Sequence, residues 1–306
     1  MRAALLHLDA ALTHQDMLAA QVVGAGGRDL DARDLGPELR LWSRPQSLER
    51  LAARLRQELP ASAGPALVFS GSGEFHHVSP ILLRRAIEAA HCEAVTVLHF
   101  DSHPDWVRFA NGVHCGSWLG QAARLPGVAK VVTVGVCSAD VRKPSPRRAD
   151  LDLLTEERLE LYAYRGPDGA ASVELCGQSW PTIAAMGESV FAAFLADRIA
   201  TEAIYITIDK DVLRADDAAT SRDQGQTSLA FLKALIAPLL SSHQLIGADV
   251  VGDWSPAVYG GGPIATLLKR GEALLDQPWA KPAPAARAAN EDVNLQLFDL
   301  IAGGAP

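Results

Sequence analysis

The chain has 306 residues, of which 48% are apolar and 21% charged, so it can bury a sizeable core in one large α/β domain or in two smaller ones. Its four cysteines show no Cys-x-x-Cys spacing, so neither a disulfide framework nor a thiolate zinc site is indicated, and a reducing cytoplasm is expected. The net charge of -8 without a Lys/Arg block argues against nucleic acid, and no apolar run approaches the ~18 to 20 residues that span a bilayer.

Short apolar runs bounded by Gly, Pro or Asp predict buried parallel strands. These runs occupy residues 66–70, 95–100, 131–136, 203–208 and 245–251. Between them, apolar residues recur at helical spacing in residues 80–90, 189–200 and 228–240. The alternation predicts a three-layer α/β/α fold in which helices cover both faces of a mostly parallel, doubly wound sheet.

The sequence predicts a single domain over residues 1–276, followed by a separate tail. Residues 141–185 are expected to form an insertion, with a small hairpin that pairs 159–164 with 172–175. The stretch 277–289 is rich in Pro and Ala and is expected to be a linker. A last helix over 291–301 would dock on this domain or on a neighbouring copy. His7 and Asp9 interrupt the apolar start of the chain, so no signal peptide is predicted.

A cluster of metal-ligand residues follows the run 95–100. Asp101, His103 and Asp105 stand at alternate positions, and in an extended segment side chains at i and i+2 share a face with Cα atoms ~6.6 Å apart. Asp105 can join the other two only if the chain curls, which Pro104 favours. The alternative is a polar loop in which Asp101 caps the next helix and His103 has no ligand role.

Two further clusters follow other apolar runs. Asp209 and Asp211 come directly after 203–208, where uncompensated burial of two carboxylates would be costly. A solvated strand end is the alternative. A Gly-rich loop after 66–70 ends in His76 and His77, either of which could be a ligand while the other packs at a helix start.

One loop histidine, Asp101, His103, Asp105, Asp209 and Asp211 make six candidate ligands. This exceeds the three protein ligands of a typical catalytic zinc, and a carboxylate-rich set favours Mn²⁺ or a related divalent ion. Two ions ~3.5 to 4 Å apart would hold a hydroxide at neutral pH, and hydrolysis is the chemistry of such a hydroxide.

The three motifs, in this order on successive strands, resemble those of the ureohydrolases, the arginase and agmatinase family. The likeness covers roughly residues 66–256. It implies that the chain has an arginase-deacetylase-like fold and is a divergent, arginase-like member of this family. It implies that Asp101 and Asp209 bridge two manganese ions. His77 and Asp105 would complete one site, and His103 and Asp211 the other. Trimers or hexamers are possible by the same resemblance.

Two further segments extend the resemblance to catalytic residues. The run around His114 is similar to the segment that supplies the family's proton-shuttling histidine, so His114 is the expected general acid/base. Where the family carries a Glu that recognises the guanidinium group, this chain has Gly252 followed by Asp253. Asp253 is the expected substitute, provided that a bulge turns it to the cavity.

We therefore expect a cytoplasmic, binuclear metal-dependent hydrolase that cleaves a C-N bond of a guanidino, amidino or related amide-like small molecule through metal-bound hydroxide. His114 would protonate the departing nitrogen, and Asp253 would stabilise developing charge. The first alternative is a single-zinc, deacetylase-like amidase. The second is a non-enzymatic protein that keeps the metal site for structure or for binding a partner.

Overall fold

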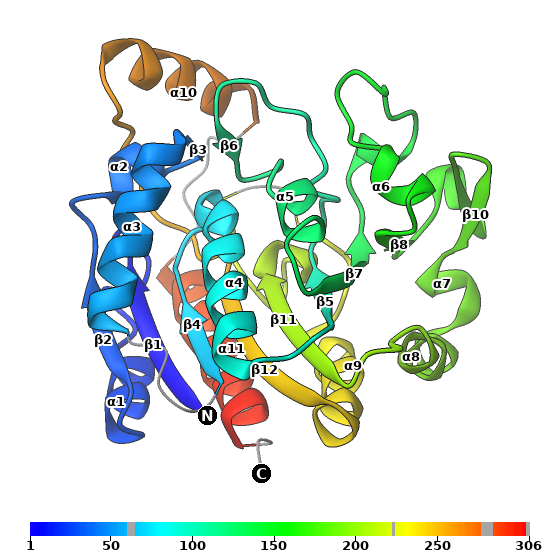
Figure 1. Cartoon of the computed structure of the whole chain (residues 1–306), viewed down its shortest axis with the longest axis horizontal. Helices are drawn as coiled ribbons and strands as arrows, with labels where there is room; N and C mark the ends of the chain where they lie inside the picture. Colours follow the sequence, from blue (N-terminus) through cyan, green and yellow to red (C-terminus); the bar gives the residue numbers. More distant parts are fainter. Residues whose placement is uncertain (60–64, 222–223, 277–283, 304–306) are drawn as a thin grey trace.

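The computed structural model describes residues 1–59, 65–221, 224–276 and 284–303. Its centre is an eight-stranded sheet in the order β2-β1-β4-β12-β11-β5-β7-β8, and every neighbouring pair is parallel (Figure 1). The strands are β1 (Arg2–His7), β2 (Arg28–Asp31), β4 (Ala66–Phe69), β5 (Val95–Phe100), β7 (Val128–Val136), β8 (Leu159–Ala163), β11 (Ala203–Asp209) and β12 (Gln244–Val251). The predicted doubly wound α/β fold is confirmed.

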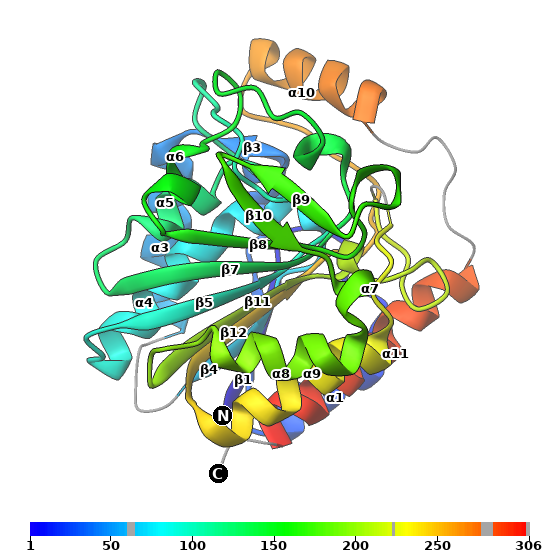
Figure 2. The ribbon, with the colours of Figure 1, turned by 90° about the vertical axis from the view of Figure 1, so that its right-hand side faces the viewer.

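Helices cover both faces of this sheet, as Figure 2 shows with the sheet seen near its edge. The helices are α1 (Asp16–Gly24), α2 (Gly36–Leu39), α3 (Pro45–Glu58), α4 (Ser79–Ala90), α5 (Leu119–Ala123), α6 (Asp152–Thr155), α7 (Ile183–Met186), α8 (Glu188–Asp197), α9 (Leu229–Ser242), α10 (Pro263–Asp276) and α11 (Pro284–Gly303). One core lies between the sheet and α3, α4 and α5, and the other between the sheet and α1, α8, α9 and α11.

Local sequence explains why these elements form. All six residues of β5 are buried, as a central parallel strand between two helical layers requires. Helix α9 begins after Ser228, whose hydroxyl accepts the Phe231 N–H at 3.1 Å and satisfies one free donor of the first turn. The five strands predicted from apolar runs all appear: β5 has the predicted bounds, and each of the other four differs from its prediction at one end.

The hairpin predicted within 141–185 is wrong in its pairing. β8 pairs with β7 at the end of the main sheet, whereas β9 (Ser172–Leu175) pairs with β10 (Gln178–Pro181). All five residues of β8 are buried, so this strand needs cover on both faces. The two residues between β9 and β10, Cys176 and Gly177, both have positive φ angles of 51° and 75°, which closes a tight hairpin.

The C-terminal helix α11 packs back on the domain. Glu291 accepts the Met17 and Leu18 N–H groups at 2.7 and 3.2 Å, at the start of α1. Residues 284–289, expected to be part of a linker, belong to α11, while 277–283 lie outside the described residues. Within the described chain, no helix has the length and apolar character that crossing a membrane requires.

Candidate metal centre

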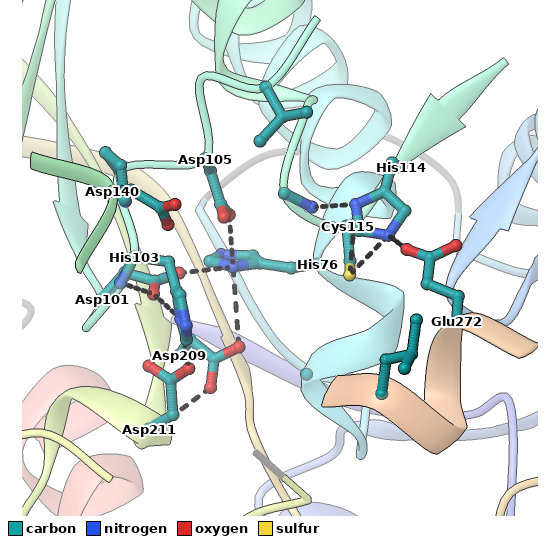
Figure 3. A pocket seen from close by; sticks show the side chains of 15 residues that line it. His76, Asp101, His103, Asp105, His114, Cys115, Asp140, Asp209, Asp211 and Glu272 are labelled. Atoms are coloured by element: carbon teal, nitrogen blue, oxygen red, sulfur yellow. Dashed lines mark hydrogen bonds and ion pairs between the residues drawn. The ribbon is translucent and has the colours of Figure 1, made fainter. Parts of the chain in front are cut away.

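The predicted metal-ligand residues meet at the carboxyl edge of the sheet. β4, β12, β11 and β5 are neighbours, so the segments that follow them converge at one edge. The short 3₁₀ helix η1 (Gly73–Val78) follows β4, Asp101 follows β5, and Asp209 ends β11. Figure 3 shows side chains from these segments pointing toward one another in one pocket.

A buried chain of hydrogen bonds fixes how the His76 ring points. Asp249 on β12 accepts hydrogen bonds from the hydroxyl groups of Ser79, Thr207 and Tyr205 at 2.7, 2.9 and 2.6 Å. Because the Thr207 hydroxyl donates to Asp249, its oxygen is free to accept from His76 Nε2, which lies 2.9 Å away. The proton of the neutral imidazole is therefore on Nε2, and Nδ1 carries a lone pair.

That lone pair faces carboxylate oxygens. His76 Nδ1 lies 3.0 Å from Asp101 Oδ2, 3.3 Å from Asp105 Oδ2 and 3.7 Å from Asp209 Oδ2. Among the described residues this nitrogen has no hydrogen-bond partner, although it is buried. A lone pair and three carboxylates repel one another unless a cation lies between them, either a proton or a metal ion. These residues therefore fit a divalent metal.

Two groups of candidate ligands share Asp101. His76, His99, Asp101 and Asp105 form an inner group, and all four are buried. Asp101, His103 and Asp211 form an outer group, in which His103 Nδ1 lies 2.9 Å from Asp211 Oδ2 and 3.5 Å from Asp101 Oδ1. The outer group is closer to solvent, since about a quarter of the His103 side chain, 24%, is exposed.

Backbone amides and one indole N–H donate hydrogen bonds to these carboxylates and fix their positions. Asp101 Oδ1 accepts the His103 N–H at 2.7 Å, and Asp211 Oδ1 accepts the Ser102 N–H at 3.0 Å. Asp105 has a left-handed backbone with φ of 46°, which Asp tolerates better than most residues. Its Oδ2 accepts the Trp118 indole N–H at 2.6 Å. The curl expected after Asp101 is therefore present.

Two glycines leave the space that the Asp209 carboxylate occupies. A Cβ atom at Gly73 would collide with Asp209 Oδ2, and one at Gly252 would collide with Asp209 Oδ1. Gly252 also has a φ of 101°, which other residues rarely adopt. Asp209 Oδ1 accepts the Asp211 N–H at 3.0 Å. Asp209 therefore lies against backbone on both sides, beside the inner group.

Charge in this cluster is balanced by protons when metal is absent. Burial and neighbouring Asp211 and Asp101 hold the pKa of Asp209 well above its usual range, and burial with Asp101 raises the pKa of Asp211 to about 6. Burial disfavours charged His76 and His103, but the adjacent carboxylates outweigh it and raise the pKa of both well above normal. Metal binding would displace these protons.

His77 was the predicted ligand, but in this structure His76 lies among the candidate ligands in its place. Adjacent residues of a 3₁₀ helix point in different directions, so only one of the two can face the cluster. His77 lies in neither group of candidate ligands. Burial, with His114 and Lys269 nearby, lowers the pKa of His77 to about 3, as expected for a neutral core histidine.

Asp253 does not face the pocket either. It lies beside Lys210, whose Nζ donates to Asp253 Oδ1 and to Asn294 Oδ1, and Asn294 Nδ2 donates to Asp253 Oδ2 at 3.2 Å. The Asp253 N–H donates to Gly71 O at 2.9 Å. The left-handed turn at Gly252 thus directs this carboxylate into a buried ion pair with Lys210, the residue after β11, and Asn294 of α11 hydrogen-bonds to both partners.

His114 lines the same pocket of about 490 Å³ as the candidate metal ligands. It lies on β6 (Val113–His114), which pairs with β3 (Trp42–Ser43). His114 Nδ1 accepts the Gly116 N–H at 2.9 Å, and Nε2 lies 2.6 Å from Glu272 Oε1 of α10, as Figure 3 shows. The proton of the neutral ring is therefore on Nε2 and faces Glu272.

The surroundings of His114 favour its charged form. Burial lowers the pKa of His114, but Cys115 and Glu272 outweigh burial and raise the pKa to about 10. A second proton can bind Nδ1 only when the hydrogen bond from Gly116 opens. Cys115 Sγ lies 3.8 and 3.9 Å from the two ring nitrogens, so it packs over the ring and makes no in-plane nucleophile–base pair.

Sequence reasoning missed His99 and Glu272. His99 lies inside an apolar strand run, but it precedes Asp101 by two positions and so shares its face, a signal that period-2 spacing could have given. Glu272 lies on α10, more than 150 residues after His114 in sequence, and no motif connects the two. Lys269 holds α10 here by donating to Glu38 O at 2.7 Å.

No protein-family model matches the chain. An uncharacterized protein of Thermotoga maritima is 24% identical over 198 residues, which are 65% of this chain and 61% of that protein. The chain thus matches about three fifths of the length of this curated relative.

Solved structures match over nearly the whole chain. Arginase from Bacillus subtilis aligns with a TM-score of 0.60 and 14% identity, over 98% of this chain and 97% of that one. Proclavaminate amidino hydrolase from Streptomyces clavuligerus gives 0.58 and 14%, over 95% and 91%. Arginase from Medicago truncatula gives 0.58 and 15%, over 99% and 87%. At these identities the likeness concerns the fold: the chain has the arginase-like α/β/α fold.

Proposed function

We propose that this protein is a divergent ureohydrolase-like enzyme, a binuclear metal-dependent hydrolase that cleaves a C–N bond of a guanidino, amidino or related amide-like small molecule. The observation that carries the proposal is the His76 lone pair, which a buried hydrogen-bond chain aims at three carboxylates. A second ligand group shares Asp101 with the first. Divalent ions bound there would activate water and stabilise developing negative charge.

In this proposal each group of ligands holds one ion. His76, Asp101 and Asp105 belong to the inner position, and His103 and Asp211 to the outer one, with Asp101 shared. Asp209 lies next to both and supplies the carboxylate that balances the second charge. The proposed ions are divalent, and Mn²⁺ suits the carboxylate-rich outer position.

His114 is the proposed proton donor to the departing nitrogen. It lines the pocket that holds the candidate metal ligands, and Glu272 holds its Nε2 proton, so the proton for the leaving group is the one that Nδ1 binds once the hydrogen bond from Gly116 opens. A histidine held by a carboxylate can keep a proton at neutral pH and give it to an amine leaving group. Glu272 acts through His114 and is therefore a positioning residue.

The pocket rim favours a cationic substrate. Gly252 offers no side chain, and Asp253 is paired with Lys210, so the loop after β12 supplies no free carboxylate to the pocket. Asp140 and Glu272 line the pocket beyond the metal-ligand residues. Because Glu272 is paired with His114, we infer that Asp140 is the rim carboxylate that attracts a guanidinium, amidinium or ammonium group by charge complementarity.

A single-zinc amidase is the second candidate, because the inner group alone offers four donors. The count of ions in the active protein separates the two: two per chain supports the binuclear hydrolase, and one zinc with full activity supports the amidase.

The activity is tested with a panel of guanidino, amidino and N-acyl amine compounds. Metal-stripped protein is reloaded with Mn²⁺ or Zn²⁺, and release of urea, ammonia or carboxylate is measured. The expected result is metal-dependent release from at least one compound, which Asp211→Asn abolishes. Asp216→Asn is the matched control, since Asp216 is exposed and lies outside both ligand groups. No release from any compound by fully loaded wild type would overturn the proposal.

A further inference from the structure

We propose that His99 is a metal ligand, so that the inner position has two imidazoles and two carboxylates and selects Zn²⁺, unlike the outer position. This inference rests on the metal centre of the proposed function and concerns which residues and which metal form it. His99 is completely buried on β5, and its Nε2 points at the same carboxylate oxygens as His76 Nδ1.

The spacing of the four donor atoms fits one tetrahedral ion. Ligand distances of about 2.0 to 2.1 Å around Zn²⁺ place neighbouring donors roughly 3.3 Å apart in a tetrahedron. His99 Nε2 lies 3.0 Å from Asp101 Oδ2 and 3.8 Å from Asp105 Oδ2. The corresponding distances from His76 Nδ1 are 3.0 and 3.3 Å. These four distances range from 3.0 to 3.8 Å, around the distance between neighbouring donors in a tetrahedron.

A simple hydrogen bond from His99 to Asp101 explains less. It would account for the 3.0 Å distance to Asp101 Oδ2, but not for the approach to Asp105 Oδ2. It would also leave a proton as the cation between His76 Nδ1 and the same two oxygens. One ion bound by both imidazoles accounts for all of these contacts.

The environment of His99 supports the ligand role. Its Nδ1 lies 3.1 Å from Thr133 Oγ1, which can accept a hydrogen bond from Nδ1–H, and in that tautomer Nε2 carries the lone pair. Trp118 packs edge-on against His99, with ring centroids 5.2 Å apart, and its indole N–H holds Asp105. The imidazole and the carboxylate are thereby fixed by the same side chain.

The donor set then predicts unlike metal preferences. Two imidazoles with two carboxylates suit Zn²⁺, whereas carboxylates with one imidazole suit Mn²⁺ better. The outer group has only His103 as a nitrogen donor. We infer that one equivalent of Zn²⁺ fills the inner position first and that a second ion enters the outer position more weakly.

The test is the zinc-edge X-ray absorption spectrum of metal-stripped wild type loaded with one equivalent of Zn²⁺. Scattering from two imidazole rings is expected. A spectrum with one imidazole would overturn the role of His99 and leave the proposed function standing. Wild type that binds no divalent metal at all would overturn both. This measurement needs no variant, so it does not depend on whether a substitution folds.

Variants give the independent measurement. His99→Ala is expected to weaken the binding of the first Zn²⁺ at least 100-fold in competition with a chelator, and to leave one imidazole in the spectrum. His77→Ala is the matched control, because His77 is equally buried but lies in neither ligand group. Equal Zn²⁺ affinity in the two folded variants would contradict the inference.

Discussion

Replacing Thr207 by valine tests how the metal centre is organised, because valine keeps the shape of threonine and removes only the hydroxyl group. In the protein this hydroxyl accepts from His76 Nε2 at 2.9 Å and donates to Asp249 Oδ1 at 2.9 Å. Thr207→Val leaves the buried Asp249 with two hydroxyl donors in place of three, and leaves the His76 N–H without an acceptor. Each buried polar group that loses its partner costs about 1 to 3 kcal/mol.

The expected loss of stability is about 2 to 3 kcal/mol in the metal-free protein, which corresponds to a fall in Tm of roughly 4 to 6 °C for a chain of this size. The second effect is on metal binding. Without an acceptor at Nε2, the His76 ring no longer prefers the tautomer with a lone pair on Nδ1. Loss of such an outer hydrogen bond typically lowers metal affinity about 10- to 100-fold.

Calorimetric metal titration and thermal unfolding, with and without metal, measure both effects. Thr96→Val is the matched control, since Thr96 is also a buried threonine and accepts from Thr201 Oγ1 at 2.7 Å, at the far end of β5. It should lose stability and keep metal affinity. The reasoning is refuted if Thr207→Val binds metal like wild type, or if Thr96→Val loses as much affinity.

Four further predictions concern proton transfer, the dependence on pH and the backbone at Gly252. His114→Asn should lower kcat about 100- to 10 000-fold while bound metal stays constant. Glu272→Gln should move the alkaline limb of the pH–rate profile to lower pH, because Glu272 helps raise the pKa of His114 to about 10; an unchanged profile would exclude the positioning role. The pKa of Asp211 is about 6 in the metal-free folded protein, against about 3.9 when unfolded, so the folded state binds more protons and its stability should fall as pH rises from about 4 to 6. Saturating metal should remove this dependence in denaturant titrations, and a metal-free protein that gains stability over this range would contradict it. Gly252→Ala would force a residue with φ of 101° against the Asp209 carboxylate, so we expect a loss of about 1 to 3 kcal/mol and of bound metal; wild-type stability and metal content would show that the close approach is unimportant.

The sequence was informative where one local pattern decides the outcome. Apolar runs predicted the central strands, because a strand covered by helices on both faces is apolar throughout. The same runs showed that Asp101, His103 and Asp211 follow the ends of buried strands. Polar side chains buried at such points need a compensating partner, which made these residues candidate ligands. The parallel pairing then brought them to one edge of the sheet.

The remaining features depend on contacts between distant segments. The choice between His76 and His77 follows from which ring reaches Thr207 on β11, and no spacing within the loop shows this. Asp253 was expected in the pocket, but Lys210 and Asn294 hold it elsewhere, and Asn294 comes from the C-terminal helix. These errors have one physical origin: tertiary partners decide the direction of a polar side chain.

The central claim is that two divalent ions are bound by ligand groups that share Asp101. Elemental analysis of metal-reloaded protein after gel filtration, comparing wild type with Asp101→Asn, tests it most directly. We predict close to two ions per chain in wild type and fewer than one in Asp101→Asn, with both proteins folded by circular dichroism. Less than one ion per chain in wild type, or an equal metal content in Asp101→Asn, would contradict it.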